Sequence, residues 1–169
     1  MNHMTTANPA SQAWPDGLLL TYYGDDFTGS TDVMEAFTAA GVPTVLFLQT
    51  LGPSALARFA DMRCVGLAGT SRGRDPAWMR SHLPAAFASL RQLGAPILQY
   101  KVCSTFDSSP SVGSIGQAID LGVKTSGATW SPMVVGAPRR GAQSRGPLLR
   151  PERHGLRRQR SRAVSSPGG

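Results

Sequence analysis

The chain has 169 residues, of which 16% are charged, and this length suits one domain with a buried core. It contains no run of about 20 apolar residues, which argues against a membrane-spanning helix. Two cysteines, Cys64 and Cys103, are too few for a disulfide framework or a metal cluster, so we expect a reducing, cytoplasmic setting. Residues 1–17 lack a signal-peptide pattern and are expected to form a flexible lead-in.

The net charge of +7 is unevenly distributed along the chain. Residues 138–169 contain nine arginines and one acid, which gives +8, whereas residues 1–137 carry eight Lys or Arg and nine Asp or Glu, which gives −1. The sequence therefore predicts an organised region over residues 18–137. It also predicts an Arg-rich tail over 138–169 that cannot bury enough apolar surface to fold.

Short apolar runs alternate with longer, partly polar segments across residues 18–137. The predicted strands cover residues 18–24, 44–49, 64–70, 97–104 and 132–137, and the predicted helices cover residues 30–41, 53–60, 75–94 and 111–125. This alternation is typical of βαβ units. It predicts an α/β fold with a Rossmann-like parallel sheet of about five strands, helices on both faces, and an irregular basic tail.

Individual residues predict where two of these helices begin and end. Ser30 is the expected N-cap of the first helix, and Gly41 is its expected C-terminal stop. Asp75, followed by a proline, is expected to start the third helix, and Gly94 to end it. Pro84 lies inside that segment and would kink or split the helix.

Polar motifs stand at the carboxyl ends of the predicted strands, where parallel sheets bind ligands. GDDFTG (24–29) follows the first strand, GTSRG (69–73) the third, KVCSTFDSS (101–109) spans the end of the fourth, and GAP (136–138) ends the fifth. Every α/β domain needs polar loops, and this is the alternative interpretation. The gathering of Asp, Ser, Thr, Arg and Lys at several ends favours a binding site.

The stretch GDDFTGST (24–31) nearly matches a phosphate-binding P-loop, but Ser30 stands where that motif has its lysine. Asp25 and Asp26 would repel phosphate in such a loop. One of these adjacent carboxylates is expected to face the crevice, where it can bind hydroxyls or Mg²⁺ or act as a general base. The other is expected to point away and cap the next helix; two capping carboxylates remain the alternative.

Two cations are expected on the same rim. Arg72 suits bidentate binding of a carboxylate or phosphate, and Lys101 suits a point contact. Lys101 interrupts an apolar run, which costs desolvation unless it has an anionic partner. Ser71, Ser104 and Thr105 can donate to hydroxyl or carboxylate oxygens. Together these groups would suit a small polyhydroxy acid.

These motifs, in their order and spacing, resemble the four-carbon acid sugar kinase family. The matching pieces are YYGDDFTGSTDVMEAF, GLAGTSR, YKVCSTFDSS with the following VGSIGQAID, and VVGAP, and they cover residues 18–138. The resemblance implies the N-terminal, substrate-binding domain of the family. It also implies phosphorylation of a small sugar acid such as threonate, erythronate or an oxo-derivative, with ATP and Mg²⁺ as cofactors.

The resemblance further implies the contacts with the acid sugar. These would come from Asp25, Asp26, Thr28, Gly29, Ser71, Arg72, Lys101, Cys103, Ser104 and Thr105. Asp26 is the predicted catalytic base, and no metal site is predicted. Many family members carry an acidic residue where this chain has Cys103, which leaves the sugar acid open. With no histidine nearby in sequence, Cys103 is more readily a buried cysteine than a nucleophile.

Family members are far longer, and their second domain supplies the ATP site. We expect that domain to be absent from this chain and the fragment to be inactive on its own. Out-of-frame reading of GC-rich codons produces a composition like that of residues 138–169, so we expect a frameshift near residue 138. The alternative is a module that binds nucleic acid or an acidic partner through this Arg-rich tail. The oligomeric state is left open.

Overall fold

The computed structural model describes residues 15–49, 52–134, 136–137 and 142–143. The chain divides into two compact units, one ending at Gly127 and the other beginning at Ala128. Most of the predicted lead-in and nearly all of the predicted Arg-rich tail lie outside the described residues, so both stay predictions. Among the described residues, no helix combines the length and the apolar character needed to cross a membrane.

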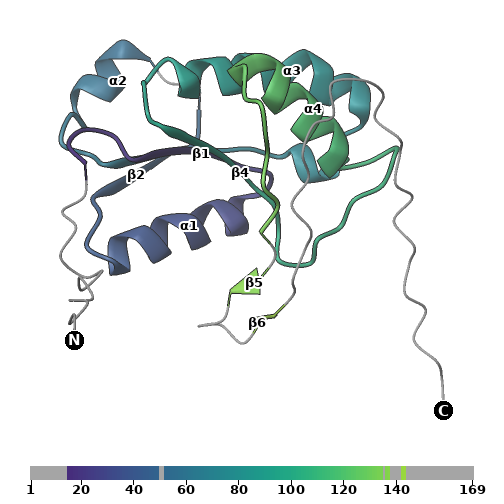
Figure 1. Cartoon of the computed structure of the whole chain (residues 1–169), viewed down its shortest axis with the longest axis horizontal. Helices are drawn as coiled ribbons and strands as arrows, with labels where there is room; N and C mark the ends of the chain where they lie inside the picture. Colours follow the sequence, from purple (N-terminus) through teal and green to yellow (C-terminus); the bar gives the residue numbers. More distant parts are fainter. Residues whose placement is uncertain (1–14, 50–51, 135, 138–141, 144–169) are drawn as a thin grey trace, which may run out of the picture. The chain divides into compact units, whose positions relative to one another are not determined.

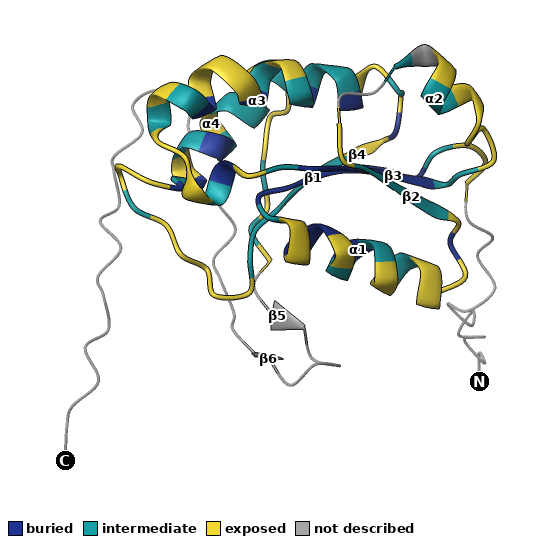
Figure 2. Ribbon diagram, turned by 180° about the vertical axis from the view of Figure 1, so that it is seen from behind, coloured by how far each residue is buried: buried dark blue, intermediate teal, exposed yellow. Residues whose placement is uncertain are grey.

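The first unit is a parallel sheet between two layers of helices (Figure 1). Its elements in chain order are β1 (Leu20–Gly24), α1 (Phe27–Ala39), β2 (Thr44–Phe47), α2 (Pro53–Ala57), β3 (Cys64–Ala68), a 3₁₀ turn (Ser71–Gly73), α3 (Pro76–Arg91), β4 (Ile97–Lys101) and α4 (Ile115–Ser126). The strands lie in the order β2-β3-β1-β4, and all three pairings are parallel. Helix α1 covers one face and α2, α3 and α4 cover the other (Figures 1 and 2), which confirms the predicted Rossmann-like class.

The predicted fifth strand over residues 132–137 does not join this sheet. Residues 132–134 form no strand. The two-residue strand β5 (Gly136–Ala137) pairs antiparallel with β6 (Ala142–Gln143) in a separate two-stranded sheet. The parallel sheet therefore has four strands within the described ranges. An apolar run indicates a buried segment, but it does not specify the segment's hydrogen-bonding partner, and this is why the prediction was wrong.

Strand β1 is the buried centre of the sheet, and all five of its residues are buried. Successive side chains of a strand point to opposite faces, so Tyr22 and Tyr23 enter different cores. Tyr22 packs in a cluster with Val33 of α1 and Cys64 of β3. Tyr23 packs on the other face in a cluster that is dominated by α3, with Met79, Leu83, Phe87 and Leu90. Residues buried on both faces explain why the strand reads as a continuous apolar run.

Helix α1 begins earlier than the sequence predicts. Its N-cap is Asp26, whose Oδ1 accepts a hydrogen bond of 2.6 Å from the backbone N–H of Gly29. Ser30 lies inside the helix, and its Oγ donates to the carbonyl of Asp26 at 2.6 Å. Both residue types are good N-caps, so sequence preference alone chose the wrong one. The predicted stop is confirmed, because Gly41 follows the helix with φ of +78°.

The predicted limits of α3 are also confirmed. The Oδ1 atom of Asp75 accepts a hydrogen bond of 2.8 Å from the backbone N–H of Trp78, and a proline occupies the first turn. Gly94 adopts φ of +80° just beyond the helix. Pro84 lies within a continuous helix and does not split it.

Substitution of two glycines tests this packing. Gly66 of β3 is paired with Tyr22 of β1, and a Cβ atom at Gly66 would lie 2.1 Å from Cζ of that fully buried ring. Gly66→Ala should therefore lower the free energy of unfolding by about 1–3 kcal/mol. Gly116→Ala in α4, where the nearest atom is 4.0 Å away, should raise it by about 0.5–1 kcal/mol. Urea unfolding measures both; an equal effect of the two substitutions would contradict the described packing.

Candidate functional site

The candidate site lies at the carboxyl end of β1. The chain leaves β1 toward α1 on one face, whereas the neighbouring strands β3 and β4 lead to α3 and α4 on the opposite face (Figures 1 and 2). Such a change of direction opens a crevice at the end of a parallel sheet. A cavity of about 640 Å³ lies there, lined by side chains of the β1–α1, β3–α3 and β4–α4 loops.

A close contact between β1 and α1 fixes the first of these loops. A Cβ atom on Gly24 would lie 1.9 Å from Oγ of Ser30, so a larger residue at this position would push the helix away. The two residues between β1 and α1 are the adjacent carboxylates, and they diverge. Asp26 turns to cap α1, whereas Asp25 is only 3% exposed and lies in the cavity wall. One aspartate caps the helix, as predicted, but it does not point away from the crevice, because Asp25 and Asp26 both line the cavity.

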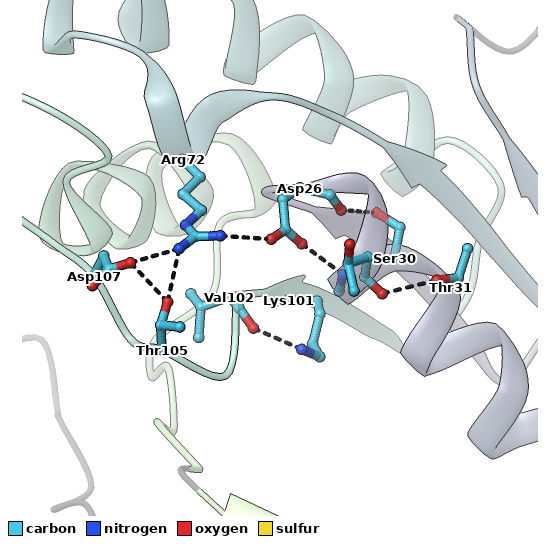
Figure 3. A network of polar contacts seen from close by, with 10 residues as sticks. Asp26, Ser30, Thr31, Arg72, Lys101, Val102, Thr105 and Asp107 are labelled. Carbon is cyan, nitrogen blue, oxygen red and sulfur yellow. Dashed lines mark hydrogen bonds and ion pairs between the residues drawn. The ribbon is translucent and has the colours of Figure 1, made fainter.

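Arg72 joins the three loops through its guanidinium (Figure 3). Its Nη1 atom lies 3.1 Å from Oδ2 of Asp26, and its Nη2 atom lies 2.6 Å from Oδ2 of Asp107. Nη2 also donates to Oγ1 of Thr105 at 2.9 Å, and that hydroxyl donates to Oδ2 of Asp107 at 2.7 Å. The guanidinium therefore bridges the β1–α1 and β4–α4 loops.

The main chain holds Arg72 in place. Its backbone N–H donates to the carbonyl of Asp25 at 3.0 Å. On the other side the N–H of Gly113 donates to the carbonyl of Arg74 at 2.8 Å. Gly113 has φ of +58°, and a Cβ atom there would lie 2.3 Å from the carbonyl oxygen of Arg72. This glycine lets the β4–α4 loop approach the 3₁₀ turn closely.

The three aspartates of the cavity have different electrostatic environments. Burial, followed by the charge of Asp26, raises the pKa of Asp25 to about 6, although Cys103, Lys101 and Arg72 act in the opposite direction. Partial burial acts to raise the pKa of Asp26, but hydrogen bonds from the Gly29 N–H, the Cys103 thiol and Arg72 bring it below the usual range. Hydrogen bonds from Arg72 and Thr105 lower the pKa of Asp107.

Asp25 is also the carboxylate with an unused oxygen. Its Oδ1 atom is buried and has no hydrogen-bond partner among the described residues. A buried polar atom without a partner costs free energy, and such atoms are rare in folded proteins. This atom is therefore a candidate contact for a ligand in the cavity.

Two stacked tyrosines lie beneath the cavity. The rings of Tyr23 and Tyr100 are parallel within 9° with centroids 5.8 Å apart, and burial raises the pKa of both hydroxyls. Oγ of Ser71 lies 2.9 Å from the Tyr100 hydroxyl, and Ser71 is fully buried. Ser71 therefore supports the loop from below rather than lining the cavity. Gly69 leaves room for the Tyr23 hydroxyl, which would lie 1.9 Å from a Cβ at that position.

The structure brings some of the predicted site residues to the cavity and places others beside it. Asp25, Asp26 and Arg72 line it, and Thr105 contacts Arg72. Lys101 is half-buried, and its Nζ donates to the carbonyl of Val102 at 2.7 Å. No ion pair of this lysine occurs among the described residues, so its expected anionic partner is not a close one.

The remaining predicted residues lie outside the cavity lining. Thr28 and Ser104 are exposed, and Gly29 is buried as the donor to Asp26. Cys103 is half-buried, and its side chain acts to lower the pKa of Asp26. The predicted contacts of all these residues with a ligand stay predictions.

Sequence reasoning missed the acid that pairs with Arg72 most closely. Asp107 lines the cavity together with Thr70, Ser108 and Ser109. The available signal was an acid within the Ser- and Thr-rich segment that follows the fourth predicted strand. The sequence predicts this segment as a strand end, but nothing in its pattern distinguishes Asp107 from its neighbours.

Comparison with known proteins places most of the chain in a known domain family. A family model described as a sugar-binding N-terminal domain matches residues 20–145. The 3-oxo-isoapionate kinase of Paraburkholderia graminis is 66% identical over 143 residues, which is 82% of this chain and 30% of that protein. The 3-oxo-tetronate kinase of Methylobacterium radiotolerans is 39% identical over 106 residues, which is 61% of this chain and 24% of that protein.

A solved structure shares the fold. A protein of Salmonella typhimurium LT2, provisionally described as a tRNA synthase, superposes with a TM-score of 0.55 at 25% identity. The match covers 68% of this chain and 28% of that protein. The chain thus spans about a third or less of each of these known proteins.

The buried carboxylate of Asp25 makes stability depend on pH. Because folding raises its pKa from 3.8 to about 6, the folded state binds its proton more tightly than the unfolded state does. This contribution to stability is complete below pH 4 and is lost as the pH rises through 6. The unfolding free energy of wild type minus that of Asp25→Asn should fall by about 2–3 kcal/mol between pH 4 and pH 7.

Denaturant unfolding of both proteins at several pH values measures this difference. Asp107→Asn is the matched control, because the pKa of Asp107 is lowered and its contribution has the opposite sign. A difference between wild type and Asp25→Asn that does not change with pH would contradict the buried carboxylate.

Proposed function

The chain belongs to the four-carbon acid sugar kinase family, whose sugar-binding N-terminal domain it carries, and we propose that its cavity binds the acid sugar that the kinase phosphorylates. The membership confirms the resemblance read from the sequence. The matched relatives are sugar-acid kinases, and the matched region is their sugar-binding part. Since the chain spans 30% or less of these relatives, the activity of a whole kinase is part of the proposal.

The observation that carries this proposal is Arg72 in a polar cavity with one exchangeable partner. The Asp107 side chain is 65% exposed, whereas the Asp26 side chain is 18% exposed and is also committed to the helix cap. An exposed ion pair contributes little stability, so a ligand carboxylate can replace Asp107 on the guanidinium. Arg72 would then hold the acid group in a bidentate contact while the carboxylate of Asp25 faces the hydroxyls.

The relatives indicate which acid to test first. Identity to the 3-oxo-isoapionate kinase is 66%, whereas identity to the 3-oxo-tetronate kinases of Methylobacterium radiotolerans and Pseudomonas fluorescens is 39% and 34%. We therefore expect 3-oxo-isoapionate to bind more tightly than 3-oxo-tetronate. Threonate and erythronate, which share an acid group and neighbouring hydroxyls, are the simpler probes of the same cavity.

The described residues do not fit a nucleotide or a metal ion. No group of three His, Cys, Asp or Glu within the described ranges is arranged to hold a metal. Arg72 is the one cation among the described residues that line the cavity, and we assign it to the acid group of the ligand rather than to a triphosphate. The ATP and Mg²⁺ implied by the family therefore belong, in this proposal, to another part of the kinase. The described domain supplies the binding of the sugar acid.

Some expectations concern residues outside the described ranges and stay predictions. These are the frameshift near residue 138, the inactivity of the fragment, and the binding of nucleic acid by the Arg-rich tail. A cytoplasmic setting and the oligomeric state are likewise open to experiment. If the tail binds DNA, the affinity should fall steeply with salt and should vanish when residues 138–169 are removed.

Calorimetric titration of the full chain tests the proposed function. 3-Oxo-isoapionate should bind, and Arg72→Lys should weaken its affinity about tenfold or more, because an ammonium cannot make the bidentate contact. Arg80→Lys is the matched control, since Arg80 is exposed on α3 and does not line this cavity. The proposal fails if none of 3-oxo-isoapionate, 3-oxo-tetronate, threonate and erythronate binds, or if the two substitutions have equal effects.

A further inference from the structure

We propose that Asp25, rather than Asp26, accepts the hydrogen bond from a hydroxyl of the bound acid sugar and is the residue placed to take that hydroxyl's proton. In this assignment Asp26 is a positioning residue, because it caps α1 and holds the guanidinium of Arg72. The inference rests on the proposed function, because it concerns how the same cavity binds the same class of ligand. It differs from the sequence-based choice of Asp26 as the catalytic base.

Asp26 already uses both of its carboxylate oxygens. Oδ1 receives the Gly29 N–H at 2.6 Å, and Oδ2 receives Nη1 of Arg72 at 3.1 Å. These two hydrogen bonds, together with the Cys103 side chain, lower the pKa of Asp26. Protonation of Asp26 would weaken the cap of α1 and the hold on Arg72. Its structural tasks therefore make it a poor proton acceptor.

Asp25 has the opposite arrangement. Its main chain is fixed on both sides, because its N–H donates to the carbonyl of Lys101 at 2.9 Å and its carbonyl receives the N–H of Arg72 at 3.0 Å. Asp25 is one of the residues that line the cavity, and its buried Oδ1 atom has no partner among the described residues. A ligand hydroxyl that donates to Oδ1 would remove the cost of this unpaired buried atom.

The charged and titratable groups around Asp25 bring its pKa close to the working pH, which a proton acceptor needs. Burial and the charge of Asp26 raise its pKa, whereas the backbone N–H of Cys103, Lys101 and Arg72 lower it, with a resulting value of about 6. Two tyrosine hydroxyls beneath it stay protonated, since burial raises the pKa of Tyr23 and of Tyr100. A pKa close to the working pH suits general base catalysis.

Binding of the ligand should lower the pKa of Asp25. The carboxylate is already removed from water, so a hydroxyl that donates to Oδ1 adds a hydrogen bond to the ionised form without further desolvation. The ligand's acid group pairs with Arg72, and the displaced Asp107 keeps its charge, but its side chain is 65% exposed and is screened by water. Binding below pH 6 should therefore release a proton from Asp25.

Calorimetry of the full chain with 3-oxo-isoapionate between pH 5 and pH 8, in buffers of different ionisation enthalpy, tests this inference. Given a pKa of about 6 in the free chain, the affinity should be roughly tenfold weaker at pH 5 than at pH 7. The proton released per ligand should approach one at pH 5 and zero at pH 8. Asp25→Asn should lose both effects, whereas Asp26→Asn should bind more weakly but still release the proton.

The outcomes separate the two proposals. If the acid binds but releases no proton at pH 5, or if Asp26→Asn rather than Asp25→Asn abolishes the release, the assignment to Asp25 is wrong and the sugar-acid cavity stands. If no sugar acid binds at any pH, the proposed function fails and the assignment fails with it. The wild-type pH profile needs no substitution, so the test does not depend on whether either variant folds.

Discussion

The close approach of α1 to the end of β1 is the constraint on which the site depends. Because Gly24 has no side chain, Ser30 can lie against the strand, and only two residues separate the strand from the helix. Asp26 then has to turn back to cap the helix, and Asp25 is left in the cavity wall. A bulkier residue at position 24 would move the helix and with it both carboxylates. One steric condition thus assigns different tasks to two adjacent, chemically identical residues.

Electrostatics in the cavity follow from this geometry. Arg72 is held by main-chain contacts on one side and by Asp26 and Asp107 on the other, so its charge is balanced before any ligand enters. The exposed partner can be exchanged for a ligand carboxylate at little cost, whereas the capping partner cannot. Asp25 remains buried with one oxygen unpaired. A domain with these features is suited to hold an acid group at one end and to receive a hydroxyl at the other.

The sequence predicted the fold class, eight of the helices and strands, and the three loops that form the cavity, because apolar periodicity and turn residues are local signals. It did not predict the N-cap, since Asp26 and Ser30 are both good caps and only the close packing at Gly24 decides between them. It also missed Asp107, whose pairing with Arg72 joins two loops that are distant in sequence. The fifth strand was misplaced because a short apolar run does not reveal its partner.

The central claim, that Asp25 is the buried carboxylate that meets the ligand, is tested most directly by NMR titration of its side-chain carboxyl ¹³C resonance. In the free chain the resonance should change with a midpoint at about pH 6, and 3-oxo-isoapionate should move that midpoint to lower pH. A midpoint near pH 4 in the free chain would contradict the burial of this carboxylate. A midpoint that saturating ligand leaves unchanged would contradict its contact with the acid sugar.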